Sequence, residues 1–105
     1  MAIQKIKSTK YVFFVKDESM TPTIPGESKI LCRKIKKDDW KNASGVVAII
    51  YDRKYTVRRV LNNGLSTNGT ITLKADNPDY GQTDIKHSEI REMWQAIEVI
   101  DKKIE

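Results

Sequence analysis

The residues with the clearest chemical potential are a serine in a polar turn and an arginine later in the chain. Ser19 follows the apolar run Tyr11–Val15 and precedes Met20 in a segment interrupted by prolines. Such a turn presents a hydroxyl at the end of a strand, where it becomes a nucleophile if a base takes its proton. Arg58 lies in Tyr55–Val60, whose β-branched and aromatic residues favour a strand. The pattern indicates serine chemistry with a basic partner.

Three segments resemble motifs of the LexA-like peptidase and phage-repressor C-terminal domain family. They are Glu18–Pro22, Val57–Arg59 and Ala75–Tyr80, in the order and spacing of the family. In that family an acidic-Ser-Met-x-Pro turn holds the nucleophile, a Val-Lys-Arg strand supplies a lysine general base, and a Ser/Ala-Asp-Asn-Pro-x-Tyr segment follows. The resemblance therefore implies that Ser19 occupies the nucleophile position and Arg58 the general-base position.

Arginine in place of lysine changes what the pair can do. The family's lysine must be neutral to accept the serine proton, and burial can lower a lysine pKa far enough for that. Guanidinium has a pKa above about 12, stays protonated and offers donors but no acceptor. Lys54 and Lys74 remain as substitutes, but Lys54 is placed about 13 Å from Arg58 along an extended strand. Ser19 is kept, but we expect Arg58 not to act as its base. Peptidase activity would then be absent unless another group activates Ser19.

The segment before Ser19 also argues against self-cleavage. Self-cleaving repressors of this family are cut at an Ala-Gly or Cys-Gly bond before the nucleophile, and neither dipeptide occurs in this sequence. Met1–Lys10 is polar and basic, so we expect residues 1–10 to form an N-terminal extension and residues 11–105 to form the LexA-like domain. DNA is then expected to be contacted only through a headpiece that this sequence lacks.

Composition limits the remaining possibilities. A chain of 105 residues with 39% hydrophobic residues suits one compact domain with one core. There is no run of about 18 apolar residues and no signal-peptide pattern, which argues against a membrane-bound signal peptidase and against a membrane partner. A single cysteine, Cys32, excludes an internal disulfide and suits the cytoplasm, and it is expected to be a buried apolar residue. His87 is the only histidine, so we expect no metal and no cofactor.

The net charge of +5 raises a nucleic-acid alternative. The basic clusters are dispersed, however, and several lie beside acids such as Asp38, Asp39 and Asp52. No aromatic-rich basic motif of the RNA-binding kind is present. Direct DNA contact by this segment is therefore a minor hypothesis.

The elements that must position these residues are mostly strands separated by turns. Period-two and apolar patterns predict them at Lys10–Val15, Lys29–Arg33, Gly45–Tyr51, Tyr55–Leu61 and Thr70–Ala75. The nearly continuous apolar run of Gly45–Tyr51 predicts a strand buried on both faces at the sheet centre, and Asp52–Lys54 predicts a hairpin turn after it. Asp38–Ala43 is predicted as a loop or a single helical turn. The fold class is mostly β, and the resemblance implies small curved antiparallel sheets.

The last segment is compatible with two structures. Helical spacing links Ile90, Met93, Trp94 and Ile97, while alternation from Met93 to Val99 also allows a strand. The resemblance implies a strand from about Glu92 to Ile100, and in the family this strand lies at the dimer contact. We therefore expect a homodimer through Met93–Ile100, and we expect the final basic residues, Lys102 and Lys103, to fray.

Three functions from different classes follow. The first is the C-terminal dimerisation domain of a phage-type or LexA-type transcriptional repressor that does not cleave itself. The second is an active serine peptidase of the LexA-like family that cleaves itself or a partner, with Ser19 activated by a group other than Arg58. The third is a small basic nucleic-acid-binding barrel.

Overall fold

A computed structural model describes residues 3–7 and 9–100 of the chain and shows a mostly β domain, as predicted. Eight described strands form one antiparallel sheet. They are β1 (Ile3–Lys7), β2 (Lys10–Val15), β3 (Ser28–Ile35), β4 (Val46–Tyr51), β5 (Lys54–Gly64), β6 (Thr70–Lys74), β7 (Gln82–Lys86) and β8 (Ile90–Ile100). Three short 3₁₀ helices, η1 (Lys37–Asn42), η2 (Pro78–Tyr80) and η3 (His87–Glu89), occupy connections.

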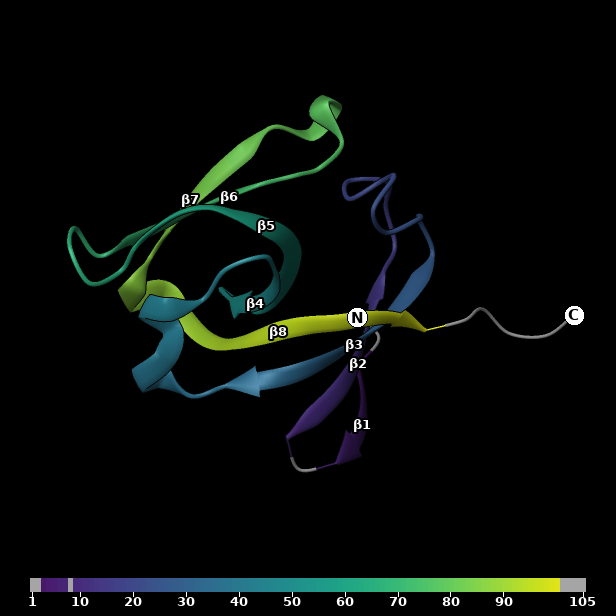
Figure 1. Cartoon of the computed structure of the whole chain (residues 1–105), viewed down its shortest axis with the longest axis horizontal. Coiled ribbons are helices and arrows are strands. Elements are labelled where there is room, and N and C mark those ends of the chain that lie inside the picture. The colour runs from purple at the N-terminus through teal and green to yellow at the C-terminus, as the bar shows by residue number, and fades with distance from the viewer. Residues whose placement is uncertain (1–2, 8, 101–105) are drawn as a thin grey trace, which may run out of the picture.

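The last strand holds the sheet together. The order is β1-β2-β3-β8-β4-β5-β6-β7, so β8 lies between β3 and β4 and joins strands β1 to β3 to strands β4 to β7. Figure 1 shows the strands from β4 to β7 curling over on one side of β8, while β3, β2 and β1 continue on the other. This curvature brings the turn after β2 close to the middle of β5, which are distant in sequence.

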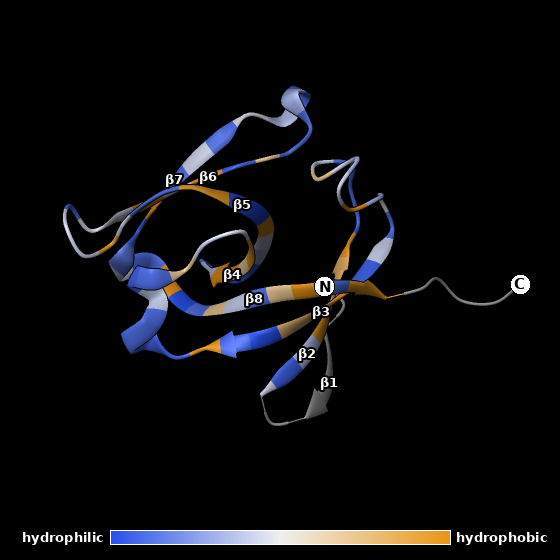
Figure 2. Cartoon of the chain, in the orientation of Figure 1, coloured by the Kyte–Doolittle hydropathy of each residue, from blue (hydrophilic) through white to orange (hydrophobic). Residues whose placement is uncertain are grey.

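Two apolar clusters cover the two faces of the sheet. The first cluster includes Phe13, Cys32, Ala48 and Trp94. The second cluster includes Trp40, Val47, Ile49 and Met93. Alternate residues of β4 and β8 point to opposite faces, so both strands contribute to both clusters. The sequence of β4, Val46–Tyr51, is apolar apart from the tyrosine hydroxyl, and Figure 2 shows orange where this strand is visible. The prediction that this strand is central and buried on both faces is therefore confirmed.

Two other predictions from sequence are also confirmed. Asp52 and Arg53 have positive φ angles of 47° and 64°, and Tyr51 pairs with Lys54, so the reversal is a two-residue hairpin. The terminal segment is a strand rather than a helix, because β8 pairs with β3 on one side and with β4 on the other. Tertiary pairing therefore outweighs the helical spacing of its apolar residues.

Strands β1 and β7 were not predicted. Ile3–Lys7 pairs with β2, and Gln82–Lys86 pairs with β6. The expected fraying of Lys102 and Lys103 lies outside the described residues. Within residues 3–7 and 9–100, no helix has the length and apolar character needed to cross a membrane.

Candidate functional site

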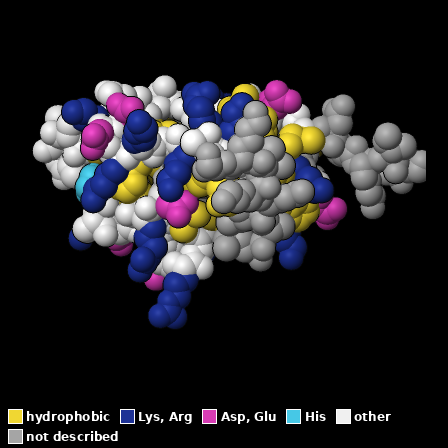
Figure 3. Space-filling view, turned by 90° about the horizontal axis from the view of Figure 1, so that it is seen from below, with side chains coloured by type: hydrophobic (Ala, Val, Ile, Leu, Met, Phe, Trp, Pro, Cys, Tyr) yellow, Lys and Arg dark blue, Asp and Glu magenta, His cyan; other side chains and the backbone are white. Residues whose placement is uncertain are grey.

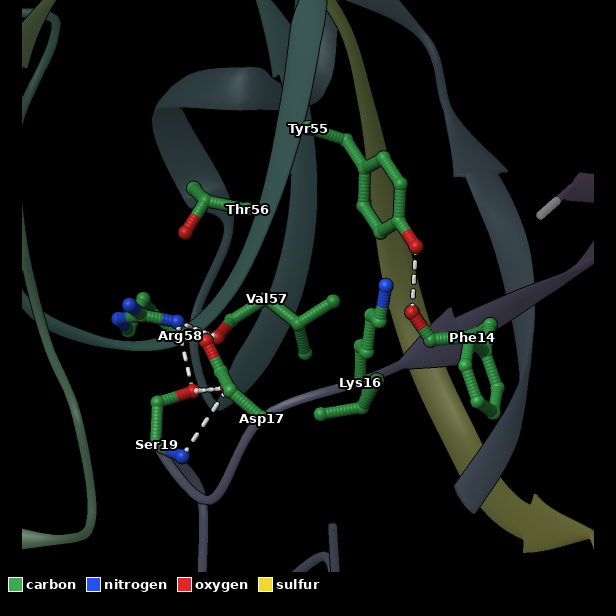
Figure 4. Close-up of a pocket in the computed structure, with 9 residues that line it drawn as sticks. Phe14, Lys16, Asp17, Ser19, Tyr55, Thr56, Val57 and Arg58 are labelled. Carbon is green, nitrogen blue, oxygen red and sulfur yellow. Dashed lines mark hydrogen bonds between the residues drawn. The ribbon is translucent and has the colours of Figure 1, made fainter. Parts of the chain in front are cut away.

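Ser19 and Arg58 meet in a small pocket between the end of β2 and the middle of β5 (Figure 4). The pocket has a volume of about 220 Å³, and its walls also include Lys16, Asp17 and Tyr55. The Tyr55 hydroxyl donates a hydrogen bond to the carbonyl oxygen of Phe14, which ties β5 to the end of β2.

The turn that carries Ser19 is held by its own backbone and by the turn after β6. The Ile24 amide donates to the Met20 carbonyl at 2.8 Å, which closes the chain tightly after the serine. The Asn77 amide donates to the Ser19 carbonyl at 2.9 Å, and the Asn77 side chain donates to the Glu18 carbonyl at 3.0 Å. Asn77 therefore anchors the serine turn through both its backbone and its side chain.

The Ser19 hydroxyl lies between an acceptor and a donor. Its Oγ donates to Asp17 Oδ1 at 2.6 Å, and the same Oγ accepts from Arg58 Nη1 at 2.9 Å. Arg58 Nη1 also donates to the Val57 carbonyl at 2.8 Å, so the guanidinium is held from two directions. The Ser19 residue is completely buried. The hydroxyl proton is therefore directed at the Asp17 carboxylate, and the hydroxyl oxygen accepts a hydrogen bond from the Arg58 guanidinium.

The carboxylate that receives this proton is a weak base. Partial burial raises the pKa of Asp17, but hydrogen bonds from the Ser19 hydroxyl and amide, together with the charge of Arg58, outweigh it. The pKa of Asp17 is therefore lowered from its ordinary value. A general base works best when its pKa lies near the working pH, so Asp17 is poorly suited to deprotonate a serine at neutral pH.

None of the lysines whose side chains the structure describes hydrogen-bonds to the Ser19 hydroxyl. Lys54 and Lys74, considered as substitutes from sequence, do not line the pocket. The Lys54 ammonium lies 5.2 Å from the centre of the Tyr51 ring, and Lys74 contributes charge near Asp76. Lys16 does line the pocket, but Figure 4 shows its ammonium directed toward Tyr55 and Phe14, away from Ser19.

A second polar cluster lies on the neighbouring turn. Arg59 makes a bidentate pair with Asp76, with Nε to Oδ1 and Nη2 to Oδ2 both at 2.8 Å, and Thr23 Oγ1 donates to Asp76 Oδ2. The hydrogen bonds from Arg59 are the main reason that the pKa of Asp76 falls to about 2. This cluster ties the segment after Ser19 to β5 and to the turn after β6.

The two residues predicted from sequence, Ser19 and Arg58, are in contact, and a third residue, Asp17, joins them. The Asp17 carboxylate accepts from both the amide and the hydroxyl of Ser19, a role that was not predicted from sequence. The signal was present, because an aspartate two residues before a serine in a turn commonly accepts from the amide two positions on. Cys32 lies elsewhere, in the core, where burial raises the pKa of its thiol to about 12. Among the described residues, no group of acidic, histidine and cysteine side chains is arranged to hold a metal ion.

Comparison with known proteins supports one family. A family model described as Peptidase S24-like matches residues 2–102. No curated protein matches the chain.

Proposed function

Because the chain belongs to the Peptidase S24-like family, we propose that it is the C-terminal dimerisation domain of a LexA-type or phage-type transcriptional repressor, with Ser19 at the nucleophile position and Arg58 at the general-base position. In this proposal the domain does not cleave itself. DNA is contacted by a headpiece in the repressor, and the domain described here supplies the pairing of two copies in the cytoplasm.

The observation that carries the loss of cleavage is the direction of the hydrogen bonds at Ser19. A neutral lysine accepts the serine proton, whereas Arg58 donates a hydrogen bond to the serine oxygen. The proton is then held by Asp17, whose lowered pKa makes it a poor acceptor for full proton transfer. The arrangement stabilises the neutral hydroxyl and leaves no described group able to generate an alkoxide.

The proposed dimer contact is the second half of β8. Pairing of β8 with β4 ends at Gln95 opposite Val47, so residues 96–100 have a strand neighbour only on the β3 side among the described residues. Ile97 and Val99 in this segment are 40% and 41% exposed. An open strand edge with exposed apolar residues is well suited to pair with a second copy of itself around a two-fold axis.

Such a contact explains how the domain would regulate DNA binding. Linking two headpieces converts the second DNA contact into an intramolecular one, which raises its effective concentration at a paired half-site. The strength of β8 pairing would then set the occupancy of the operator.

Sedimentation velocity over a range of protein concentrations tests the proposed interface. We expect the native chain to form a dimer and Ile97→Asp to sediment as a monomer, because a carboxylate would be buried between the two copies. Leu61→Asp is the matched control, since Leu61 is also exposed, at 52%, but lies on β5. A dimer that survives Ile97→Asp, or that Leu61→Asp weakens equally, would overturn the interface.

Met93, the first residue of the interface expected from sequence, is unsuitable for this test. Met93 is fully buried in the second apolar cluster and faces the core. The expectation that the contact begins at Met93 is therefore wrong for its side chain, and Met93→Asp is expected to unfold the domain rather than to dissociate it.

A further inference from the structure

A basic groove lies at the far end of the sheet from the exposed part of β8. It has a volume of about 560 Å³ and lies between the end of β3, the helix η1 and the start of β8. Its floor is apolar and its rim is cationic. The floor contains Ile35, Trp40 and Ile90, and the rim contains Lys36, Lys37 and Arg91. We call this site the β3–β8 groove.

The groove exists because two paired strands separate. Pairing between β3 and β8 ends at Ile35 opposite Met93. After Ile35 the chain turns into η1, while β8 continues toward Ile90 paired only with β4 among the described strands. Residues 90–92 of β8 therefore present an edge without a strand partner to the groove, and Arg91 is the extra residue at a bulge in that pairing.

The cations of the rim form no described ion pair, although Arg91 also lines a second hollow with Asp52 and Glu89. Among the residues that the structure describes, one ion pair is present, between Arg59 and Asp76. Lys36, Lys37 and Arg91 take part in no ion pair there. Glu92, an acid at the groove, accepts a hydrogen bond from Trp94 Nε1 at 3.0 Å. A neighbouring hollow of about 360 Å³ shares Lys36 with the groove and adds one cation, Arg33, and one acid, Asp39.

The shape of this surface distinguishes two kinds of anionic partner. Figure 3 shows dark blue side chains, with magenta ones among them, around a small yellow area near the cyan histidine. The Trp40 and His87 rings lie 5.5 Å apart. Trp40 is only 5% exposed and its Nε1 is bonded to the Ile35 carbonyl, so its ring offers little area for stacking a base. An apolar floor beside an open strand edge instead suits an extended peptide.

We propose that the β3–β8 groove binds an extended acidic peptide segment of a partner protein. An apolar side chain of the peptide packs against Ile35, the member of the floor that is only half-buried. Acidic side chains on either side of it meet Lys36, Lys37 and Arg91, and the peptide backbone lies along the open edge of β8. This site contains neither the Ser19–Arg58 pair nor residues 96–100, so it is independent of the proposed repressor function.

Fluorescence anisotropy with the full chain tests the proposal. The probe is a short fluorescein-labelled peptide with one central valine flanked on each side by glutamates. We expect saturable binding that weakens as salt rises, because exposed charge pairs are screened. Lys36→Glu combined with Arg91→Glu should weaken binding by about tenfold or more, since two attractive contacts become repulsive. Lys29→Glu combined with Arg53→Glu makes the same charge change at exposed positions outside the groove and should change binding by less than about twofold.

Three comparison probes decide between the alternatives. A peptide with glutamine in place of glutamate should lose binding, and one with serine in place of valine should bind more weakly. The proposal would be overturned if the acidic peptide does not bind, or if the glutamine peptide binds as tightly as the acidic one. It would also be overturned if the control variant loses as much binding as Lys36→Glu combined with Arg91→Glu. A single-stranded oligonucleotide of the same charge that binds more tightly, and that depends on Lys36 and Arg91, would replace it with a nucleic-acid site.

Discussion

At the scale of single residues, the site depends on which group donates each proton. Replacing a lysine by an arginine keeps a positive charge but removes the ability to accept a proton. With Arg58 donating to the Ser19 oxygen, the hydroxyl must direct its own proton elsewhere, and Asp17 is the acceptor within reach. Under the proposed assignment, an arginine at the general-base position therefore donates to the serine oxygen where a neutral lysine would accept the serine proton.

The sequence was sufficient to predict this pair but not its surroundings. The resemblance of Glu18–Pro22 and Val57–Arg59 to family motifs placed Ser19 and Arg58 in contact, and they are 2.9 Å apart. The pairing of Arg59 with Asp76 could not be predicted in the same way, because it depends on how the turn after β6 folds back onto β5. Strand periodicity reports which face a residue is on, but not which distant turn it meets.

The Arg59–Asp76 pair gives a prediction about acid stability. The pKa of Asp76 is lowered to about 2 in the folded protein, so its contribution is present above the ordinary value near 4 and is lost as pH falls through about 2. Asp76→Asn should lower the free energy of unfolding at pH 7 by roughly 1 kcal/mol, discounted because Arg59 is 40% exposed.

Urea unfolding at pH 7, 4 and 2 measures this effect. The stability gap between the native chain and Asp76→Asn should shrink as the pH falls. Asp79→Asn removes an exposed carboxylate from η2 and should leave stability nearly unchanged at each pH. A gap that is constant from pH 7 to pH 2 would show that the Asp76 charge does not stabilise the fold.

At the scale of elements, local pattern predicted the long strands better than the edges. β2 and the β4–β5 hairpin have strong β-branched content and a clear turn, and they form where predicted. β7 is short, polar and exposed except for Ile85, so its sequence carries little strand signal. It forms because β6 offers it a backbone edge. β1 is a similar case, since Met1–Lys10 was read as a basic extension and contains a strand that pairs with β2.

The β4–β5 hairpin supports a prediction about its turn. Arg53 has a φ angle of 64°, a left-handed conformation that costs an L residue about 1 kcal/mol and glycine almost nothing. Arg53→Gly should therefore raise the free energy of unfolding by roughly 0.5 kcal/mol after the greater entropy of unfolded glycine is deducted. Arg53→Ala removes the same side chain but keeps the strain, so it should bring no gain. Thermal unfolding of both variants compares them, and equal midpoints would reject the backbone explanation.

At the scale of the whole molecule, the two apolar clusters are coupled through shared strands. β4 sends Ala48 to one cluster and Val47 and Ile49 to the other, and β8 sends Trp94 and Met93 to opposite faces. Loss of either cluster would remove packing from the strands that support the other. We therefore expect one cooperative transition, as is usual for small single domains.

Each cluster contains one tryptophan, which makes this coupling measurable. Trp94 reports on the first cluster and Trp40 on the second. In Trp40→Phe and in Trp94→Phe, the fluorescence of the remaining tryptophan and the far-UV circular dichroism should give the same urea midpoint. A fluorescence transition that precedes loss of the sheet signal in either variant would show that the two clusters unfold separately.

The reactivity of Ser19 tests the central claim, that Arg58 silences the site, most directly. The chain, Arg58→Lys and Ser19→Ala/Arg58→Lys would each be incubated with a fluorophosphonate over a range of neutral to alkaline pH, and modification of Ser19 would be read by mass spectrometry. We predict no modification of the native chain, modification of Arg58→Lys that rises at alkaline pH as the lysine becomes neutral, and none in the double variant. Modification of Ser19 in the native chain would contradict the claim, and so would an Arg58→Lys variant that stays folded and unreactive at every pH.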